Sequence, residues 1–361
     1  MRDLAPKLAA AGAVTTFIIG LAWADDEVHR HSAKIPLRGT IQSETSKDVE
    51  IQRKDNGKKE TVPVNDIAKI EYDGPVNLAM QQAQIHERGG EFEKAVEAYS
   101  KIASDASTKQ LPARAAKFGR ASTLARWAER DPAHAADAIK SLEEFVKQNA
   151  ESRFHYAAHE LLGQLQLSQG NAQAAGAAFA ELGKAPWPEL RLKATIYEGR
   201  ILIATDKHDQ AIAKFDAAIK AAGKSDVEKL RAHEAQLGKA ECLVKQKKYD
   251  EAEKLLRGVI DDASSEQGSL HAGAFNLLGD VQREGGKTKE AVLSYLYVDL
   301  LHADARGEHA KSLCYLALLW DQLGRADRAE DARDRLRKEY PTSSWVKLAD
   351  QKPDGATKKA E

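Results

Sequence analysis

Two histidines one helical turn apart are the first residues in this chain that could do chemistry. His155 and His159 are four positions apart, and on a helix that spacing turns both imidazoles toward one side, where they could bind a metal ion such as zinc. A zinc site needs a third protein ligand, and Glu160, the carboxylate next in sequence, points elsewhere on the helical wheel. The pair is therefore predicted to be packed or solvated, and the sequence predicts no metal site.

Paired glycines are the second chemical signal. Gly89-Gly90 and Gly285-Gly286 could cradle a phosphate, but a phosphate loop follows a strand and continues into Lys-Ser or Lys-Thr. Neither pair has such neighbours, so both pairs predict turns between helices. No nucleophile, base and orienting group can be assembled from the remaining residues. The sequence therefore predicts no catalytic residues, no cofactor and no enzyme.

The overall charge also excludes some partners. The 361 residues have a formal net charge of -1, so no net field favours nucleic acid or an anionic membrane. The two cysteines, Cys242 and Cys314, fall in different helical segments, too far apart for a disulfide to be expected. We predict that both are buried free thiols.

The N-terminus has the pattern of an export signal. Arg2 and Lys7 precede an apolar run over residues 8–21, and residues 22–24 have the small-x-small pattern of a cleavage site. The run is short for a bilayer span, which needs about 20 residues. We therefore expect residues 1–24 to be a signal peptide, a mature chain that begins at Asp25, and a periplasmic or extracellular location. An uncleaved anchor is the alternative.

Residues 25–75 predict a small β domain. Val49 and Ile51 alternate with polar residues, which is the period of a half-buried strand, and Asn56-Gly57 is a strong hairpin signal. Four or five short strands in this length predict a small barrel or a curled sheet. The pattern resembles small SH3-like or Sm-like domains.

Single residues refine that expectation. Gly39 is predicted to form a bulge, and Pro63 predicts an edge strand because proline cannot donate to a sheet ladder. His29 and His31 are predicted to lie in flexible chain ahead of the first strand.

Residues 76–347 repeat. Alanines 36 to 43 residues apart open a series of second helices: Ala95, Ala138, Ala175, Ala211, Ala252, Ala291 and Ala329. Four residues after each alanine stands a large apolar side chain, except in the last unit: Tyr99, Leu142, Phe179, Phe215, Leu256, Tyr295 and Arg333. Twelve residues before all but the second stands a small residue: Ala83, Gly163, Gly199, Ala240, Gly279 and Ala317. Small residues let two helices approach closely, and the large residue fills the space between neighbouring units.

The units carry a family resemblance. Leu162-Gly163, Gly170, Ala175 and Phe179 resemble the tetratricopeptide repeat, with its leucine–glycine pair, its turn glycine and its alanine–x3–aromatic pattern. The resemblance implies a mainly α fold, an α-solenoid of about seven helical hairpins. The spacing exceeds the usual 34 residues, and Arg333 replaces the aromatic residue, which suits the polar outer face of a terminal capping unit. Residues 348–361 are predicted to be disordered.

The resemblance also implies where a partner binds. Tetratricopeptide repeats line a concave groove with one face of each first helix. The polar residues at matching positions are Gln84, Arg88, Glu160, Gln164, Lys193, Arg200, Glu241, Lys245, Asn276, Asp280 and Arg283. The lysine–asparagine set that some members use to bind a C-terminal carboxylate is not present.

The predicted function is a scaffold of the bacterial cell envelope that binds a protein or peptide segment in the groove. The alternative is a structural subunit of a larger envelope complex, assembled through the faces of the stack and the β domain. An open face with convergent polar residues would favour the first function, and an exposed apolar patch would favour the second. The sequence leaves the oligomeric state open.

Overall fold

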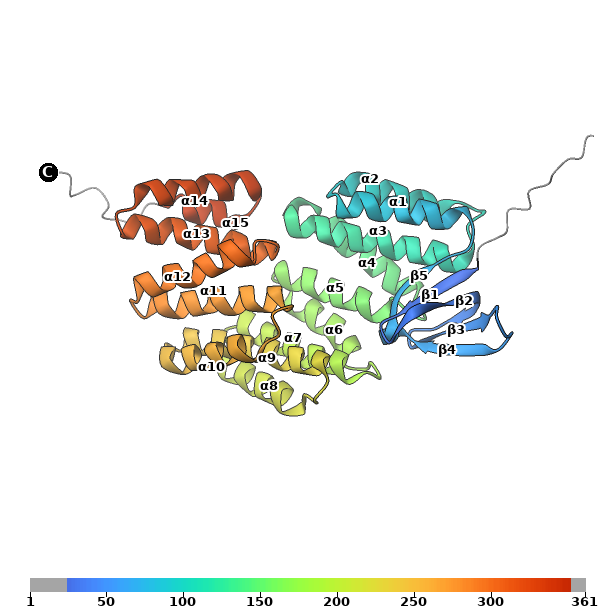
Figure 1. The fold of residues 1–361 in the computed structure, drawn as a ribbon, viewed down its shortest axis with the longest axis horizontal. Coiled ribbons are helices and arrows are strands. Elements are labelled where there is room, and N and C mark those ends of the chain that lie inside the picture. The colour runs from blue at the N-terminus through green and yellow to red at the C-terminus, as the bar shows by residue number, and fades with distance from the viewer. Residues whose placement is uncertain (1–24, 352–361) are drawn as a thin grey trace, which may run out of the picture.

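The computed structural model describes residues 25–351, so the predicted signal peptide and residues 352–361 lie outside the described part of the chain. Within the described residues, five strands precede fifteen α-helices (Figure 1). The strands are β1 (Asp26–Arg30), β2 (Ala33–Glu44), β3 (Asp48–Arg53), β4 (Lys59–Pro63) and β5 (Ile67–Glu71). The helices are α1 (Pro75–Arg88), α2 (Phe92–Ser104), α3 (Gln110–Arg130), α4 (Ala135–Gln148), α5 (His155–Ser168), α6 (Ala172–Leu182), α7 (Pro188–Ala204), α8 (His208–Ala221), α9 (Asp226–Lys245), α10 (Tyr249–Asp262), α11 (Gly268–Glu284), α12 (Thr288–Leu301), α13 (Arg306–Gln322), α14 (Ala326–Glu339) and α15 (Ser344–Ala349).

The strands form one antiparallel sheet in the order β4-β3-β2-β1-β5. Alternate residues of the strands point into one buried core, among them Val28, Val49 and Ile51, which are fully buried. The guanidinium of Arg30 on β1 lies 2.9 Å from the Glu60 carboxylate on β4, although two strands separate them, so the sheet curls. Pro63 ends β4, which is an edge strand as the sequence predicts.

Two expectations for this sheet are wrong. His29 does not lie in flexible chain, because β1 is a strand of the sheet interior, paired with both β2 and β5. Gly39 does not form a bulge, since its register on β3 is regular and the irregularity falls between Ile41 and Ser43. The lack of a side chain at Gly39 serves close strand packing instead: a Cβ there would lie 2.0 Å from the carbonyl oxygen of Gln52.

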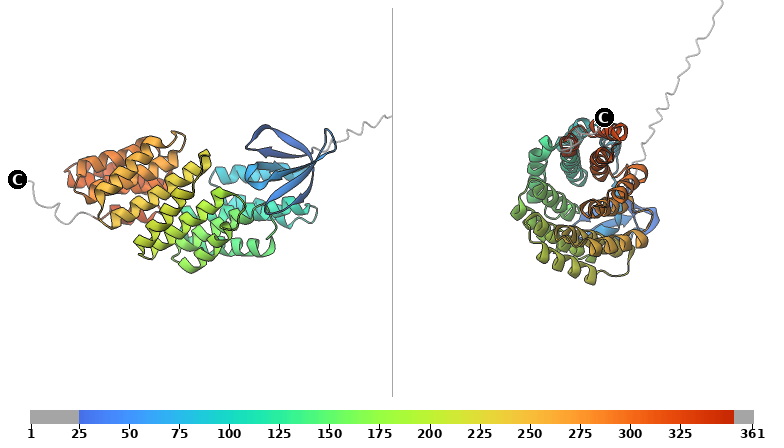
Figure 2. Two further views of the ribbon diagram at one scale, coloured as in Figure 1. Left: turned by 90° about the horizontal axis from the view of Figure 1, so that it is seen from below. Right: turned by 90° about the vertical axis from the view of Figure 1, so that its left-hand side faces the viewer.

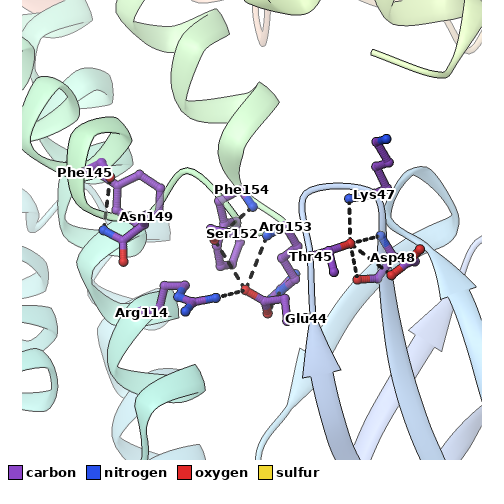
Figure 3. Close-up of polar contacts among 10 residues, drawn as sticks. All are labelled: Glu44, Thr45, Lys47, Asp48, Arg114, Phe145, Asn149, Ser152, Arg153 and Phe154. Atoms are coloured by element: carbon purple, nitrogen blue, oxygen red, sulfur yellow. Dashed lines mark hydrogen bonds and ion pairs between the residues drawn. The ribbon is translucent and has the colours of Figure 1, made fainter. Parts of the chain in front are cut away.

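One carboxylate ties the sheet to the helices (Figure 3). Glu44 ends β2, and its side chain is 1% exposed. Its carboxylate lies 3.3 Å from a guanidinium nitrogen of Arg114 on α3 and 3.2 Å from Nε of Arg153, in the loop before α5. The same carboxylate accepts hydrogen bonds from the Arg153 amide and the Ser152 hydroxyl. A buried charge is stable only with such partners, so this contact fixes the β domain against the second and third hairpins.

Helices α1 to α14 form seven consecutive hairpins that wind into a superhelix (Figures 1 and 2). First helices touch across hairpins: α1 with α3, α3 with α5, α7 with α9, α9 with α11 and α11 with α13. Within residues 25–351 no two consecutive second helices pack as extensively. The first helices therefore line the inside of the curve and the second helices its outside. The last hairpin returns to the second one, because the Thr342 hydroxyl in the loop after α14 donates to the Arg130 carbonyl at the end of α3.

The small residues predicted from the repeat lie where helices touch. A Cβ on Gly163 would fall 2.5 Å from the ring of Phe179, one on Gly199 would fall 2.6 Å from Phe215, and one on Gly279 would fall 2.7 Å from Tyr295. These aromatic rings are essentially buried. The glycine therefore provides the space that each ring fills.

The last hairpin departs from the expected polar cap. Arg333 is buried rather than facing solvent: its Nε donates to the Ala349 carbonyl at 2.8 Å, and its guanidinium pairs with Asp321. Helix α15 covers this end of the stack, since Trp345 and Leu348 pack against the core of α13 and α14. The terminal unit is thus closed by an added helix, and the arginine anchors that helix.

The two cysteines are buried and free, as predicted. Burial raises the pKa of each thiol to about 12, so both stay protonated at neutral pH. Cys242 and Cys314 therefore act as small apolar core residues.

The glycine contact can be tested with a matched pair of substitutions. Gly279→Ala should lower the free energy of unfolding by about 1–3 kcal/mol, because the added methyl group overlaps the Tyr295 ring. Gly258 on α10 is the control, since a Cβ there meets no atom within 4 Å. Gly258→Ala should raise the free energy of unfolding by about 0.5–1 kcal/mol through helix propensity. Urea denaturation measures both, and equal stability of the two variants would contradict the proposed packing.

Candidate protein-binding surface on the first helices

Four of the predicted surface residues gather around one tyrosine, Tyr197 on α7. Its hydroxyl donates to the Glu160 carboxylate on α5 at 2.9 Å, and the Lys193 ammonium lies 2.6 Å from the same carboxylate oxygen. The Gln164 amide donates to the Tyr197 hydroxyl, and the Arg200 guanidinium lies 5.6 Å from the ring centroid. We call these five residues the Tyr197 cluster.

The Tyr197 cluster bridges α5 and α7. These two first helices are consecutive but are not among the contacting pairs given above. Long polar side chains span the space between the two helices. On its other side the Tyr197 ring stacks on Phe179, with centroids 4.0 Å apart. Burial and then the Glu160 carboxylate raise the pKa of Tyr197, so the phenol remains a hydrogen-bond donor at neutral pH.

A second group surrounds Asp280 on α11. Its carboxylate accepts a hydrogen bond from the Tyr295 hydroxyl at 2.8 Å and pairs with the Lys311 ammonium on α13 at 2.6 Å. The Arg283 guanidinium lies 4.5 Å from the ring centroid of Tyr315. Although burial lowers the pKa of Lys311, the nearby Asp280 outweighs it and the pKa is raised. We call these five residues the Asp280 cluster.

The two clusters occupy equivalent positions in the repeat. Lys193 and Tyr197 stand six and two residues before Gly199, as Lys311 and Tyr315 do before Ala317. Tyr315 stacks on Tyr295 with centroids 5.3 Å apart, as Tyr197 does on Phe179. Sequence reasoning missed both tyrosines and Lys311. They could have been found in the sequence, because lysine recurs six residues and tyrosine two residues before the small residue in these two units.

The remaining predicted residues do not join a cluster. Gln84 and Arg88 are exposed on α1, where the Arg88 side chain donates to the Gln84 carbonyl at 3.3 Å. Glu241 and Lys245 on α9 have no side-chain hydrogen bond or ion pair within the described residues. Asn276 is fully buried and donates to the Glu308 carbonyl at 2.9 Å, so its amide joins α11 to α13 below the surface.

The histidine pair lies on α5, with ring centroids 4.7 Å apart. The nearest carboxylate contact is Glu181 on α6, 4.0 Å from Nε2 of His155. Burial, and then the neighbouring His155, lower the pKa of His159 to about 4. Both rings are therefore neutral at pH 7 and pack against each other.

A cleft of about 470 Å³ opens between α9 and α10, with His233, Gln236 and Lys239 among its lining residues. None of the eleven predicted surface residues lines it.

Comparison with known families decides what kind of repeat this is. A tetratricopeptide-repeat model matches residues 127–187 and 198–267, which run from the end of α3 to the loop after α10. The chain carries tetratricopeptide repeats. The repeat register found in the sequence continues on both sides of the matched residues, through seven consecutive hairpins. Tetratricopeptide-repeat proteins are scaffolds for protein interaction.

Among the solved structures similar to this chain, one supports the fold. A tetratricopeptide repeat protein from Parabacteroides merdae is 16% identical and covers 76% of this chain and 99% of its own, with a TM-score of 0.52. NprR in complex with its cognate peptide NprX is 14% identical and covers 76% of this chain and 81% of its own, with a TM-score of 0.49. PilW, a type IV pilus biogenesis factor, is 16% identical and covers 63% and 95%, with a TM-score of 0.40. At these identities the first comparison supports the tetratricopeptide-repeat fold and nothing finer.

Among curated protein sequences, none matches this chain at a significant level. Across residues 25–351, no helix combines the length and the apolar character that a membrane crossing requires.

The buried histidine predicts a pH dependence. Because His159 binds its proton at about pH 4 when folded and at its ordinary 6.5 when unfolded, acid favours the unfolded chain. The contribution of the neutral His159 ring to the free energy of unfolding is fully present above about pH 6.5 and is lost as the pH falls toward 4. Between pH 7 and pH 5 the free energy of unfolding should therefore fall by about 1–2 kcal/mol less in His159→Asn than in the wild type. This figure allows for partial exposure of the ring. Urea denaturation at both pH values measures this, and equal losses would contradict it.

Proposed function

We propose that this tetratricopeptide-repeat protein is a non-catalytic scaffold that binds a segment of another protein along its first helices. The Tyr197 cluster is the observation that supports the proposal most strongly. It brings a carboxylate, an amide, a phenol and two cations together on the inner side of the curve, from two consecutive hairpins. An extended or helical segment fits a surface of this kind.

The contacts within the cluster suit binding because they fix its side chains in advance. Lys193 and Glu160 hold each other at 2.6 Å, and Tyr197 is fixed by both a hydrogen bond and a stacked ring. Ordering such side chains before association reduces the entropy that binding costs. Arginine and tyrosine are also the residues that most often dominate an interface. Arg200, which is exposed beside the Tyr197 ring, is therefore the residue expected to contribute most.

The proposed location is the bacterial cell envelope. The basic start, the apolar run and the small-x-small pattern of residues 22–24 support export. Strand β1 begins at Asp26, so cleavage before Asp25 would leave every strand of the described sheet in place. The buried, unpaired cysteines are compatible with an oxidising compartment because neither thiol is accessible.

Export predicts a defined N-terminus. Edman sequencing or intact-mass measurement of the protein from its native cells should give a chain that begins at Asp25. Recovery of chains that retain Met1 in the cytosolic fraction would contradict the export proposal without touching the binding proposal.

A second function, that of a structural subunit, is favoured by one observation. Every exposed side chain of α12 from Leu293 onward is apolar: Leu293, Tyr297, Leu300 and Leu301 are each at least half exposed. They follow one another at helical spacing along the outer side of the sixth hairpin. Apolar stripes of this kind often mark contacts with another protein. The stripe and the first-helix surface lie on different sides of the stack and are separable by mutation.

Charge removal on the first-helix surface tests the binding proposal. Lys193→Gln with Arg200→Gln should weaken binding of a partner recovered from envelope extracts about tenfold, and the loss should shrink as salt is raised. Glutamine is preferred to a reversed charge at residue 193, because an acid there would face Glu160. Titration calorimetry at two salt concentrations gives the affinities.

The matched control removes the same charge from the outside of the stack. Lys140 and Lys147 are both exposed on α4, a second helix. Lys140→Gln with Lys147→Gln should leave affinity unchanged. Equal weakening by the two double variants would mean that net charge, and not the first-helix surface, governs binding.

A further inference from the structure

Three metal-ligand side chains meet on the outer face of the β sheet. Glu27 and His29 are two residues apart on β1, so both point away from the core that holds Val28. Glu71 on β5 is the register partner of Glu27. One atom of each side chain, a carboxylate oxygen or an imidazole nitrogen, lies within 4.8 Å of the other two.

The distances within this group are wrong for hydrogen bonds and right for a bound ion. Nε2 of His29 lies 3.5 Å from the Glu27 carboxylate and 3.9 Å from the Glu71 carboxylate, whereas a charged hydrogen bond would be about 2.7–2.9 Å long. Ligands placed tetrahedrally at zinc bond lengths of about 2.0–2.2 Å are separated by about 3.4 Å. The two distances from His29 are thus close to the ligand spacing around a coordinated zinc ion.

The imidazole nitrogen is the second observation. Nε2 of His29 is shielded from solvent and has no hydrogen-bond partner within residues 25–351. A shielded polar atom without a partner costs free energy, and a metal ion would satisfy it. Arg38 pairs with the other oxygen of Glu27 at 2.9 Å, which leaves one oxygen of Glu27 facing the histidine.

We propose that Glu27, His29 and Glu71 form a binding site for a divalent transition-metal ion of the zinc class. One imidazole and two carboxylates suit zinc and its neighbours in the first transition row, and do not suit calcium or magnesium, which prefer oxygen alone. The ion joins β1 to β5. It must displace the Lys69 ammonium from Glu71, where the two side chains now form an ion pair. Lys69 is more than half exposed, so its side chain is free to move into solvent.

The site is tested with the full chain stripped of metal and titrated with zinc chloride by calorimetry. The wild type should bind one zinc ion per chain, and zinc should raise its melting temperature. His29→Ala should weaken the binding by more than about 100-fold, because a first-sphere ligand is lost. Lys69→Met should bind zinc several-fold more tightly than the wild type, because it no longer competes for Glu71.

Two control variants separate this site from the other histidines. His31→Ala changes the neighbouring exposed histidine, and His155→Ala with His159→Ala removes the pair on α5. Both should bind zinc like the wild type. The proposal is overturned if the wild type does not bind zinc, if His29→Ala binds zinc as the wild type does, or if the α5 double variant is the one that loses binding.

Discussion

The stack depends on an aromatic ring seated where the facing helix has no side chain. Phe179 over Gly163, Phe215 over Gly199 and Tyr295 over Gly279 repeat this contact along the solenoid. A hairpin alone would leave its large residue in water, so each ring must be covered by neighbouring helices, and this requirement joins the units into one body. The Phe215 ring requires two such glycines, because a Cβ on Gly238 of the next unit would also fall 2.4 Å from it.

The same rings position the polar surface. A tyrosine of the following first helix stacks on each of two rings: Tyr197 stacks on Phe179, and Tyr315 stacks on Tyr295. Each tyrosine lies among charged residues on the inner side of the curve. The core therefore determines where the clusters lie. This connects the packing of the solenoid with the proposed binding of a protein segment.

The repeat itself could be predicted because its small and large residues recur in register. Seven hairpins and the edge strand that ends at Pro63 both follow from spacing and local propensity. The polar clusters could not be predicted in full, because Glu160 and Lys193 meet across two hairpins and only a three-dimensional stack brings them together. Tyr197 and Tyr315 are not part of the seven-fold repeat, because a tyrosine stands at this offset in only two units.

Other differences have local causes. His29 lies in a short segment near the predicted cleavage site, so its place in a strand depends on the pairing of β1 with β2 and β5. Arg333 was expected to face solvent because of its charge, but Asp321 and the end of α15 compensate that charge inside the stack. In both cases tertiary partners outweigh the local preference.

Site-specific photo-crosslinking in living cells tests the central claim most directly, that a partner lies along the first helices. A photoreactive residue would be placed singly at Arg200 or Lys245 on the inner side, at Lys147 on α4, and at Leu300 on α12. The binding surface proposed here predicts one common crosslinked partner at residues 200 and 245 and none at residue 147. Crosslinks confined to residue 300 would contradict it and would favour a structural subunit that assembles through α12.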